Sequence, residues 1–195
     1  MGRCHSCGSR IAWRYPAVEA LTGALFLLTV WRFGFGVRSV LLLVLLSALV
    51  VVTFTDLEHK MIPHAVTLPG IPLGLIGSLF TLDPSPQDAA LGVLMGAGLV
   101  YFVAIYGEVI FKQESMGGGD VNLLAMIGAF LGYKLMFVTF VFAVITSGLI
   151  SLGLIAARVV TRKDLIPFGP YLAIGAVVAM FAGDWLIDWY IRLSR

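Results

Sequence analysis

The stretch SVLLLVLLSALVVVTFTD, residues 39–56, holds seventeen uncharged residues and ends on the carboxyl group of Asp56. An apolar run of this length approaches the roughly 20 residues that an α-helix needs to cross the hydrocarbon core of a bilayer. A carboxyl group this close to the apolar phase is costly and is usually retained for a function. The stretch therefore predicts a membrane-spanning helix that ends at a functional acid. The structural alternative is a carboxylate solvated among lipid headgroups.

The rest of the chain is equally apolar. Of the 195 residues, 59% are hydrophobic and 12% are charged, whereas soluble domains are about 45–50% apolar. We expect an all-α fold, a polytopic bundle of about six to seven membrane helices, because long apolar segments recur along the chain. The element at 120–131 is too short to span alone, so it is either tilted and buried among its neighbours or continuous with the next helix across Gly132. The expected helices cover residues 17–35, 38–56, 65–82, 88–111, 120–131, 135–159 and 168–192.

The basic residues predict an orientation, because Lys and Arg concentrate on the cytoplasmic side of membrane proteins. Eight of the 13 Lys and Arg residues lie in the N-terminal strip, or in and beside the loops at 57–64, 112–119 and 160–167. These segments are therefore expected in the cytoplasm. A net charge of +2 is too small to indicate a nucleic-acid partner. Two crossings separate Asp56 from Asp120, so these acids are expected on the same side in either orientation.

A glycine-rich turn precedes the second of these acids. Gly117, Gly118 and Gly119 come directly before Asp120 at the start of an apolar element. Glycines let the backbone turn tightly and let another segment approach closely. The plain structural interpretation is a turn in which Asp120 caps the free amides of the helix that follows. A phosphate-binding loop is disfavoured, since the P-loop Lys is missing and an acid stands where the anion would bind.

Together the two acids indicate chemistry that neither indicates alone. Hydrolysis of a peptide bond without a metal ion or a nucleophilic side chain needs one carboxylate that takes a proton from water and a second, protonated carboxyl group that gives one to the carbonyl oxygen. Asp56 and Asp120 supply both groups on one side of the membrane, which favours an aspartic peptidase that needs no cofactor for proteolysis. The alternative is a proton- or cation-coupled transporter, in which the same carboxyl groups would bind the ion.

The order of the motifs resembles the type IV prepilin peptidase family of GxGD membrane aspartic proteases. The matching features are Asp56 with Ile62 and Pro63 after it, MGGGD at 116–120, IPFGPY at 166–171 and the opening GRCHSC at 2–7. The resemblance implies a multi-pass enzyme of the bacterial inner membrane with its active site facing the cytoplasm. It would remove the leader of prepilins or pseudopilins after a Gly. By motif position, Asp56 and Asp120 would be the catalytic acids, and Gly117, Gly118 and Gly119 the active-site loop.

The same resemblance concerns cofactors and domains. Cys4 and Cys7 resemble half of the four-cysteine zinc site of bacterial members, whose other CxxC and first transmembrane helix do not stand in this sequence. We expect a cytoplasmic basic strip at 1–16, with a partial structural zinc motif, and a transmembrane protease domain at 17–195. Inert thiols are the alternative. Full-length members also methylate the new N-terminus with S-adenosylmethionine, and Asn122 replaces a Lys that is common in the family.

Two further segments are interpreted as structural. The prolines of PFGP, residues 167–170, are expected to stop one segment and start the last helix. Glu58, His59 and Lys60 are expected in a solvated loop beside Asp56.

The orientation is tested by cysteine labelling in a variant that lacks Cys4 and Cys7. A cysteine introduced at Lys60 should escape an impermeant thiol reagent in intact cells and react once the cells are permeabilised. A cysteine at Gln87, in the loop expected outside, should react in intact cells. Ready labelling at position 60 from outside would reverse the orientation.

Overall fold

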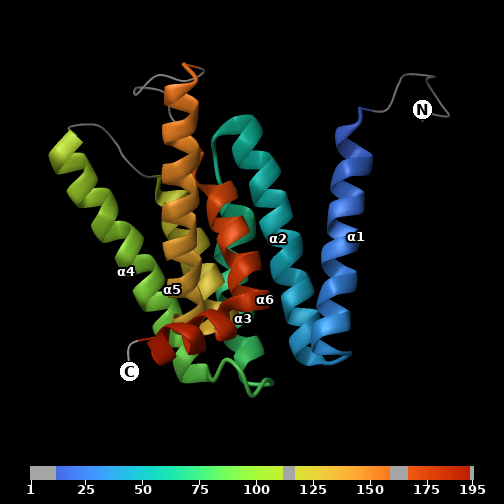
Figure 1. Cartoon of the computed structure of the whole chain (residues 1–195). Helices are drawn as coiled ribbons and strands as arrows, with labels where there is room; N and C mark the ends of the chain where they lie inside the picture. The colour runs from blue at the N-terminus through green and yellow to red at the C-terminus, as the bar shows by residue number, and fades with distance from the viewer. Residues whose placement is uncertain (1–11, 112–116, 159–166, 194–195) are drawn as a thin grey trace.

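The computed structural model describes residues 12–111, 117–158 and 167–193, and these residues form a bundle of six α-helices without a strand (Figure 1). The expected all-α bundle is confirmed. The helices are α1 (Arg14–Phe33), α2 (Val37–His59), α3 (His64–Ser78), α4 (Pro86–Phe111), α5 (Gly118–Ala156) and α6 (Gly169–Leu193). Six helix labels cover the seven expected elements, because α5 carries one label for the segments expected at 120–131 and 135–159, although its backbone is non-helical at Gly132 between them.

Five of these helices, α1, α2, α4, α5 and α6, are long and apolar enough to cross a membrane. The exception is α3, which has 15 residues and contains Pro69 and Pro72. At about 1.5 Å per residue it is shorter than the roughly 30 Å of a hydrocarbon core. Short α3 still carries the chain from the end of α2 back toward its start, because Gly77 near the end of α3 lies against Leu41 near the start of α2.

The chain reverses direction at Gly132, inside α5. Gly132 has φ 76° and ψ 169°, a left-handed backbone that favours glycine. At this break Gly132 lies against Pro84, while Leu135 just beyond it packs against Gly183 near the far end of α6. Every residue from Leu123 to Gly132 is buried, as expected for a segment that is apolar all round and enclosed by neighbours. The short segment is therefore buried, and Gly132 marks where it ends.

Helices α4 and α5 touch through their backbones. A Cβ atom added at Gly92 would overlap the backbone of Gly128, and one added at Gly128 would overlap the backbone of Gly92. One turn away, a Cβ at Gly96 would lie 2.8 Å from the carbonyl oxygen of Leu124. Small residues permit this close approach in membrane bundles, where helix association depends on packing because lipid tails are as apolar as the side chains.

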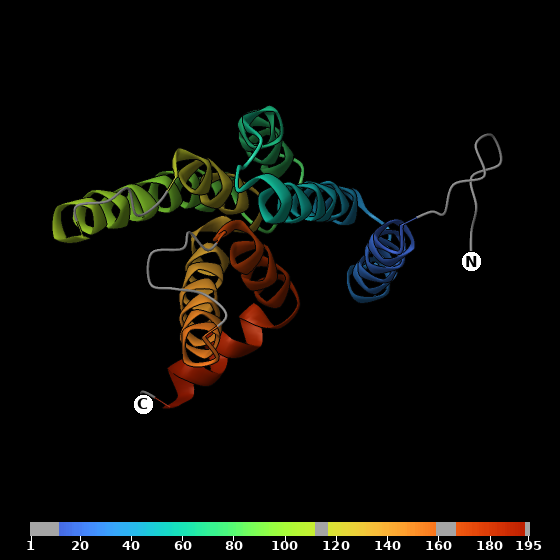
Figure 2. The same cartoon turned by 90° about the horizontal axis from the view of Figure 1, so that it is seen from above.

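Helix α1 lies at the side of the bundle (Figure 2). It packs mainly against α2, and its C-terminal end reaches α6 where the rings of Phe33 and Phe181 lie 6.0 Å apart. Its outer face carries exposed apolar side chains such as Leu27 and Trp31. Such a face suits contact with lipid, so α1 is an accessory to a core whose buried apolar residues come from α2, α4, α5 and α6.

The close contact of α4 with α5 predicts a large penalty for one added methyl group. Gly128→Ala should destabilise the protein by roughly 1–3 kcal/mol, because overpacking forces two backbones apart. Gly98→Ala is the matched control, since nothing lies within 4 Å of a Cβ at that position. Thermal unfolding in detergent measures both variants, and an unchanged midpoint for Gly128→Ala would contradict the packing described.

Candidate active site

Two ionisable side chains are buried among the described residues, those of Asp56 and Asp120, which are 5% and 7% exposed. Charged groups are almost never buried this deeply unless they are hydrogen-bonded or paired. Asp56 lies near the C-terminal end of α2 and Asp120 in the first turn of α5, and both helix ends lie toward the top of Figure 1. The acids thus share one end of the bundle, as the count of crossings predicts.

Asp56 is held by the backbone of a distant helix. Its Oδ2 accepts a buried hydrogen bond of 2.9 Å from the N–H of Gly169. Gly169 is the first residue of α6, where backbone N–H groups have no partner within the helix and the helix dipole attracts negative charge. The α2 backbone ends just beyond, with Lys60 in the left-handed conformation and its N–H donating to the Asp56 carbonyl at 2.8 Å. Asp56 therefore caps α6 from the end of α2.

Asp120 is the third residue of α5, and Gly117 is the N-cap. The interpretation of Asp120 as the N-cap is therefore wrong. Its carboxyl group instead reaches back and accepts a hydrogen bond from the backbone of Gly117, the geometry of the acidic member of a capping box. The other oxygen, Oδ1, is buried and has no hydrogen-bond partner among the described residues.

Ile62 packs between two glycines, one beside each acid. A Cβ atom at Gly119 would lie 2.8 Å from the Cβ of Ile62, and one at Gly169 would lie 3.3 Å from Ile62 Cδ1 and 2.7 Å from Asp56 Oδ2. The start of α5 and the start of α6 therefore meet at this side chain. The two carboxyl groups are close enough to interact electrostatically.

The three glycines before Asp120 have different structural roles. Gly117 is the extended N-cap, with φ −78° and ψ 150°. Gly118 has open space around a possible Cβ, whereas Gly119 has none because of Ile62. Among the three, only Gly119 lacks room for a side chain, and this close contact brings the start of α5 against the loop that follows Asp56.

A polar contact joins the starts of α3 and α5 beside the acids. The side-chain amide nitrogen of Asn122 lies 3.1 Å from Nδ1 of His64. With the amide donating, this ring nitrogen is the acceptor. The contact fixes the register of two helices that run in the same direction from the same end of the bundle.

Glu58 is exposed, as expected, but it and His59 lie in the last turn of α2 and not in a loop. Its carboxylate forms an ion pair of 2.5 Å with Arg14, at the start of α1, and lies 4.0 Å from the ring of His59. The side chains of Arg14 and Glu58 are 69% and 41% exposed. Exposed pairs of this kind contribute little to stability, so the pair serves mainly to place α1 beside the end of α2.

Two residues of the site were missed by sequence reasoning, Gly169 and Ile62. Gly169 was assigned with its prolines to helix termination, and Ile62 was noted only as part of a motif. The available signal for Gly169 was its place at a helix start, where free N–H groups attract a carboxylate. For Ile62 no local signal distinguishes it from the other apolar residues of the chain.

The predicted zinc ligands Cys4 and Cys7 lie outside the described residues. Within 12–111, 117–158 and 167–193, no group of three or more His, Cys, Asp or Glu side chains could hold a metal ion. Asp184 and Asp188 are exposed and lie about 15 residues or more beyond Gly169 on α6, roughly 22 Å away along the helix. They stand apart from the candidate active site.

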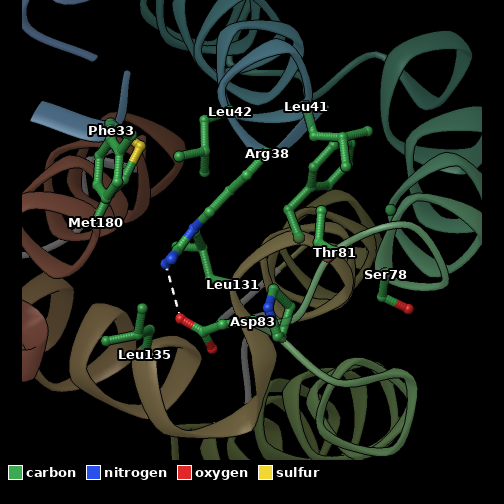
Figure 3. Close-up of a pocket in the computed structure, with 13 residues that line it drawn as sticks. Phe33, Arg38, Leu41, Leu42, Ser78, Thr81, Asp83, Leu131, Leu135 and Met180 are labelled. Atoms are coloured by element: carbon green, nitrogen blue, oxygen red, sulfur yellow. Dashed lines mark hydrogen bonds and ion pairs between the residues drawn. The ribbon is translucent and has the colours of Figure 1, made fainter. Parts of the chain in front are cut away.

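The pocket drawn in Figure 3 lies at the opposite end of the bundle. Arg38 crosses it to form a 2.8 Å ion pair with Asp83, and its guanidinium lies 5.2 Å from the centre of the Phe33 ring. The pocket volume is about 20 Å³, which is room for about one water molecule. A space of this size is too small for a peptide, so the ion pair there joins α2 to the turn before α4.

Comparison with known proteins connects the chain to one family. The model of the type IV leader peptidase family matches residues 43–152, which include both acids, and the bacterial peptidase A24 N-terminal domain matches residues 1–33. A prepilin leader peptidase/N-methyltransferase of Stutzerimonas stutzeri is 32% identical over 194 residues, covering 100% of this chain and 67% of that protein. Proteins of the same name from Xanthomonas campestris pv. campestris and Bacillus subtilis are 36% and 31% identical, covering 99% of this chain and 67% and 76% of their own lengths. No solved structure matches the chain.

The contact between Gly169 and Asp56 can be tested by stability alone. Gly169→Ala should destabilise the protein by roughly 1–3 kcal/mol, because the added methyl group displaces the carboxylate from its hydrogen bond. The penalty should shrink when Asp56 is also replaced by Ala, since the displaced group is then gone. Gly148→Ala, at a position with open space, serves as the control in thermal unfolding. Equal penalties for Gly169→Ala in both backgrounds would refute the contact.

Proposed function

This chain belongs to the type IV leader peptidase family, and we propose that it cleaves the leader peptides of type IV prepilins or pseudopilins with Asp56 and Asp120 as its catalytic pair. Membership confirms the resemblance inferred from the motifs and makes the chain a membrane peptidase. One observation carries the assignment of the pair. The two ionisable side chains buried among the described residues come from different helices to the same end of the bundle.

The surroundings of the two acids support different roles. Asp56 accepts an N–H donor at the start of α6, an arrangement that stabilises negative charge. One oxygen of Asp120 is buried without a partner, which makes a charge on that group costly. In our proposal Asp56 is the ionised carboxylate that activates water, and Asp120 carries the shared proton.

The proposed reaction moves two protons. Asp56 takes a proton from water as the water oxygen attacks the scissile carbonyl carbon, and Asp120 gives its proton to the carbonyl oxygen. The resulting tetrahedral diol then collapses. Asp56 returns its proton to the leaving amine as the C–N bond breaks, and Asp120 recovers a proton from the diol. Both carboxyl groups end in their starting states, so the cycle needs only water and the substrate.

We place the cleavage on the cytoplasmic face, after a Gly of the leader. The distribution of Lys and Arg supports this orientation, and Arg14 and Lys60 lie at the helix ends nearest Asp56. A prepilin substrate joins a basic leader to an apolar helix. A pair of carboxyl groups at one end of the bundle suits a peptide bond that lies where the apolar helix of the substrate leaves the bilayer.

The proposed cleavage reaction includes neither methylation nor a zinc ion. The relatives carry the name N-methyltransferase as well as peptidase; for this chain methylation with S-adenosylmethionine stays a prediction from the resemblance, as does zinc at Cys4 and Cys7. The transporter alternative is not favoured, because the matched family and the curated relatives are peptidases.

The proposal predicts that Asp56→Asn and Asp120→Asn each abolish cleavage of a prepilin peptide by the purified protein. Asn keeps the size of the side chain but cannot transfer a proton, a contribution of roughly 10²–10⁴-fold in rate. Both variants should remain folded in detergent.

Glu58→Gln is the matched control, since it removes a carboxylate two residues from Asp56 that pairs with Arg14 at the surface. It should keep most of the activity. Cleavage at near wild-type rate by Asp120→Asn would show that the peptidase mechanism is wrong.

A further inference from the structure

Thr67 differs from every other threonine that the structure describes. Its hydroxyl group has no hydrogen-bond partner among the described residues, although its side chain is fully buried. Each of the others donates its hydroxyl to the carbonyl four residues earlier, the usual bond for a helical threonine. These are Thr22, Thr29, Thr53, Thr55, Thr81, Thr139 and Thr146. The hydroxyl of Thr67 is thus available for another partner.

The packing of α3 on α5 places Thr67 below Asp120. Ile62 contacts Gly119, His64 contacts Asn122 and Gly70 contacts Met126, so the two helices run in parallel with a nearly constant offset. By this register Thr67 lies level with about residue 124, roughly one turn deeper than Asp120. Thr67, Gly70 and Gly74 share one face of α3, and the two glycines contact α5. Thr67 therefore faces α5.

The packing of α3 on α2 gives a similar depth for Thr67 in the bundle. Gly77 lies against Leu41, and the short loop at 60–63 makes the two helices antiparallel. Counting back from this contact, Thr67 is level with about residue 51 of α2, roughly one turn below Asp56. Side chains lean toward the N-terminus of their helix, so Thr67 leans toward the end that holds the acids. By both registers Thr67 therefore lies about one helical turn deeper in the bundle than the two acids.

Thr67 Oγ1 and Asp120 Oδ1 are the two buried side-chain polar atoms without a partner in the described part of the chain. Orphaned buried groups of this kind are rare and call for an explanation. In the proposed reaction Asp120 becomes an ion when it gives up its proton, and its buried Oδ1 then needs a donor. A hydroxyl group can supply one.

We propose that Thr67 is a positioning residue for the reaction, whose hydroxyl donates to Oδ1 of Asp120 when that carboxyl group becomes ionised. The inference rests on the proposed function. Catalytic hydrogen bonds are often unmade in the resting enzyme and form as the reaction proceeds. Because the bond forms with the charge, it stabilises the transition state more than the bound substrate, and its loss lowers kcat rather than raising KM.

The test compares Thr67→Val with Thr67→Ser in prepilin cleavage by the purified full chain. Val is nearly the shape of Thr without a hydroxyl, so kcat should fall roughly ten- to hundredfold, the usual effect of a hydrogen bond to a charged group. KM should change little. Ser restores the hydroxyl and should recover most of kcat. The thermal midpoint of Thr67→Val should not fall, because no resting-state bond is lost.

Thr139→Val is the matched control. Thr139 is equally buried, but its hydroxyl donates to Leu135 within α5, so kcat should stay at the wild-type value. If Thr67→Val does not fold, Thr67→Ala takes its place with the same expected loss. Wild-type kcat in the hydroxyl-free variant, or equal losses in it and in Thr67→Ser, would overturn the proposal. Asp120→Asn is measured in parallel. If that variant stays active, the proposed peptidase mechanism is wrong; if it is inactive while Thr67→Val keeps the wild-type kcat, only the role of Thr67 is wrong.

Discussion

The hydrogen bond from the N–H of Gly169 to Asp56 brings together the parts of the chain that form the site. It joins the end of α2 to the start of α6, 113 residues apart in sequence. A buried carboxylate needs such a donor, and a helix start has N–H groups that need an acceptor. Each group therefore satisfies a requirement of the other. Ile62 fills the remaining space against Gly119 and so sets the distance of α5 from this junction.

Close helix packing is what allows a short segment to carry Asp120 into the bundle. The first part of α5 is enclosed on all sides, and Gly92, Gly96 and Gly128 let α4 approach its backbone directly. The turn at Gly132 then returns the chain along α6. A helix that crossed the membrane in one pass would expose part of its surface to lipid. Enclosure instead keeps Asp120 away from lipid, at the same end of the bundle as Asp56.

Most of the fold could be predicted, because membrane helices follow from local apolar runs and from the charged residues, glycines and prolines that end them. The helix boundaries, the break at Gly132 and the shared side of Asp56 and Asp120 all rest on such signals. The partner of Asp56 could not be predicted in this way, since a contact between residues 56 and 169 depends on how two helices cross. The prediction of Asp120 as the N-cap was wrong by three residues, because the N-cap is Gly117 and sequence alone does not separate the glycines of the turn from those of the helix.

The central claim is that Asp56 and Asp120 act as one catalytic unit, and the Asp56→Asn/Asp120→Asn double variant tests it most directly. The measurement is its rate of prepilin cleavage beside the rates of the two single variants. If the carboxyl groups share one proton-transfer cycle, removing either disables the other, so the double variant should be scarcely slower than each single one. Independent losses that multiply in the double variant would contradict a shared cycle, because the two groups would then contribute separately.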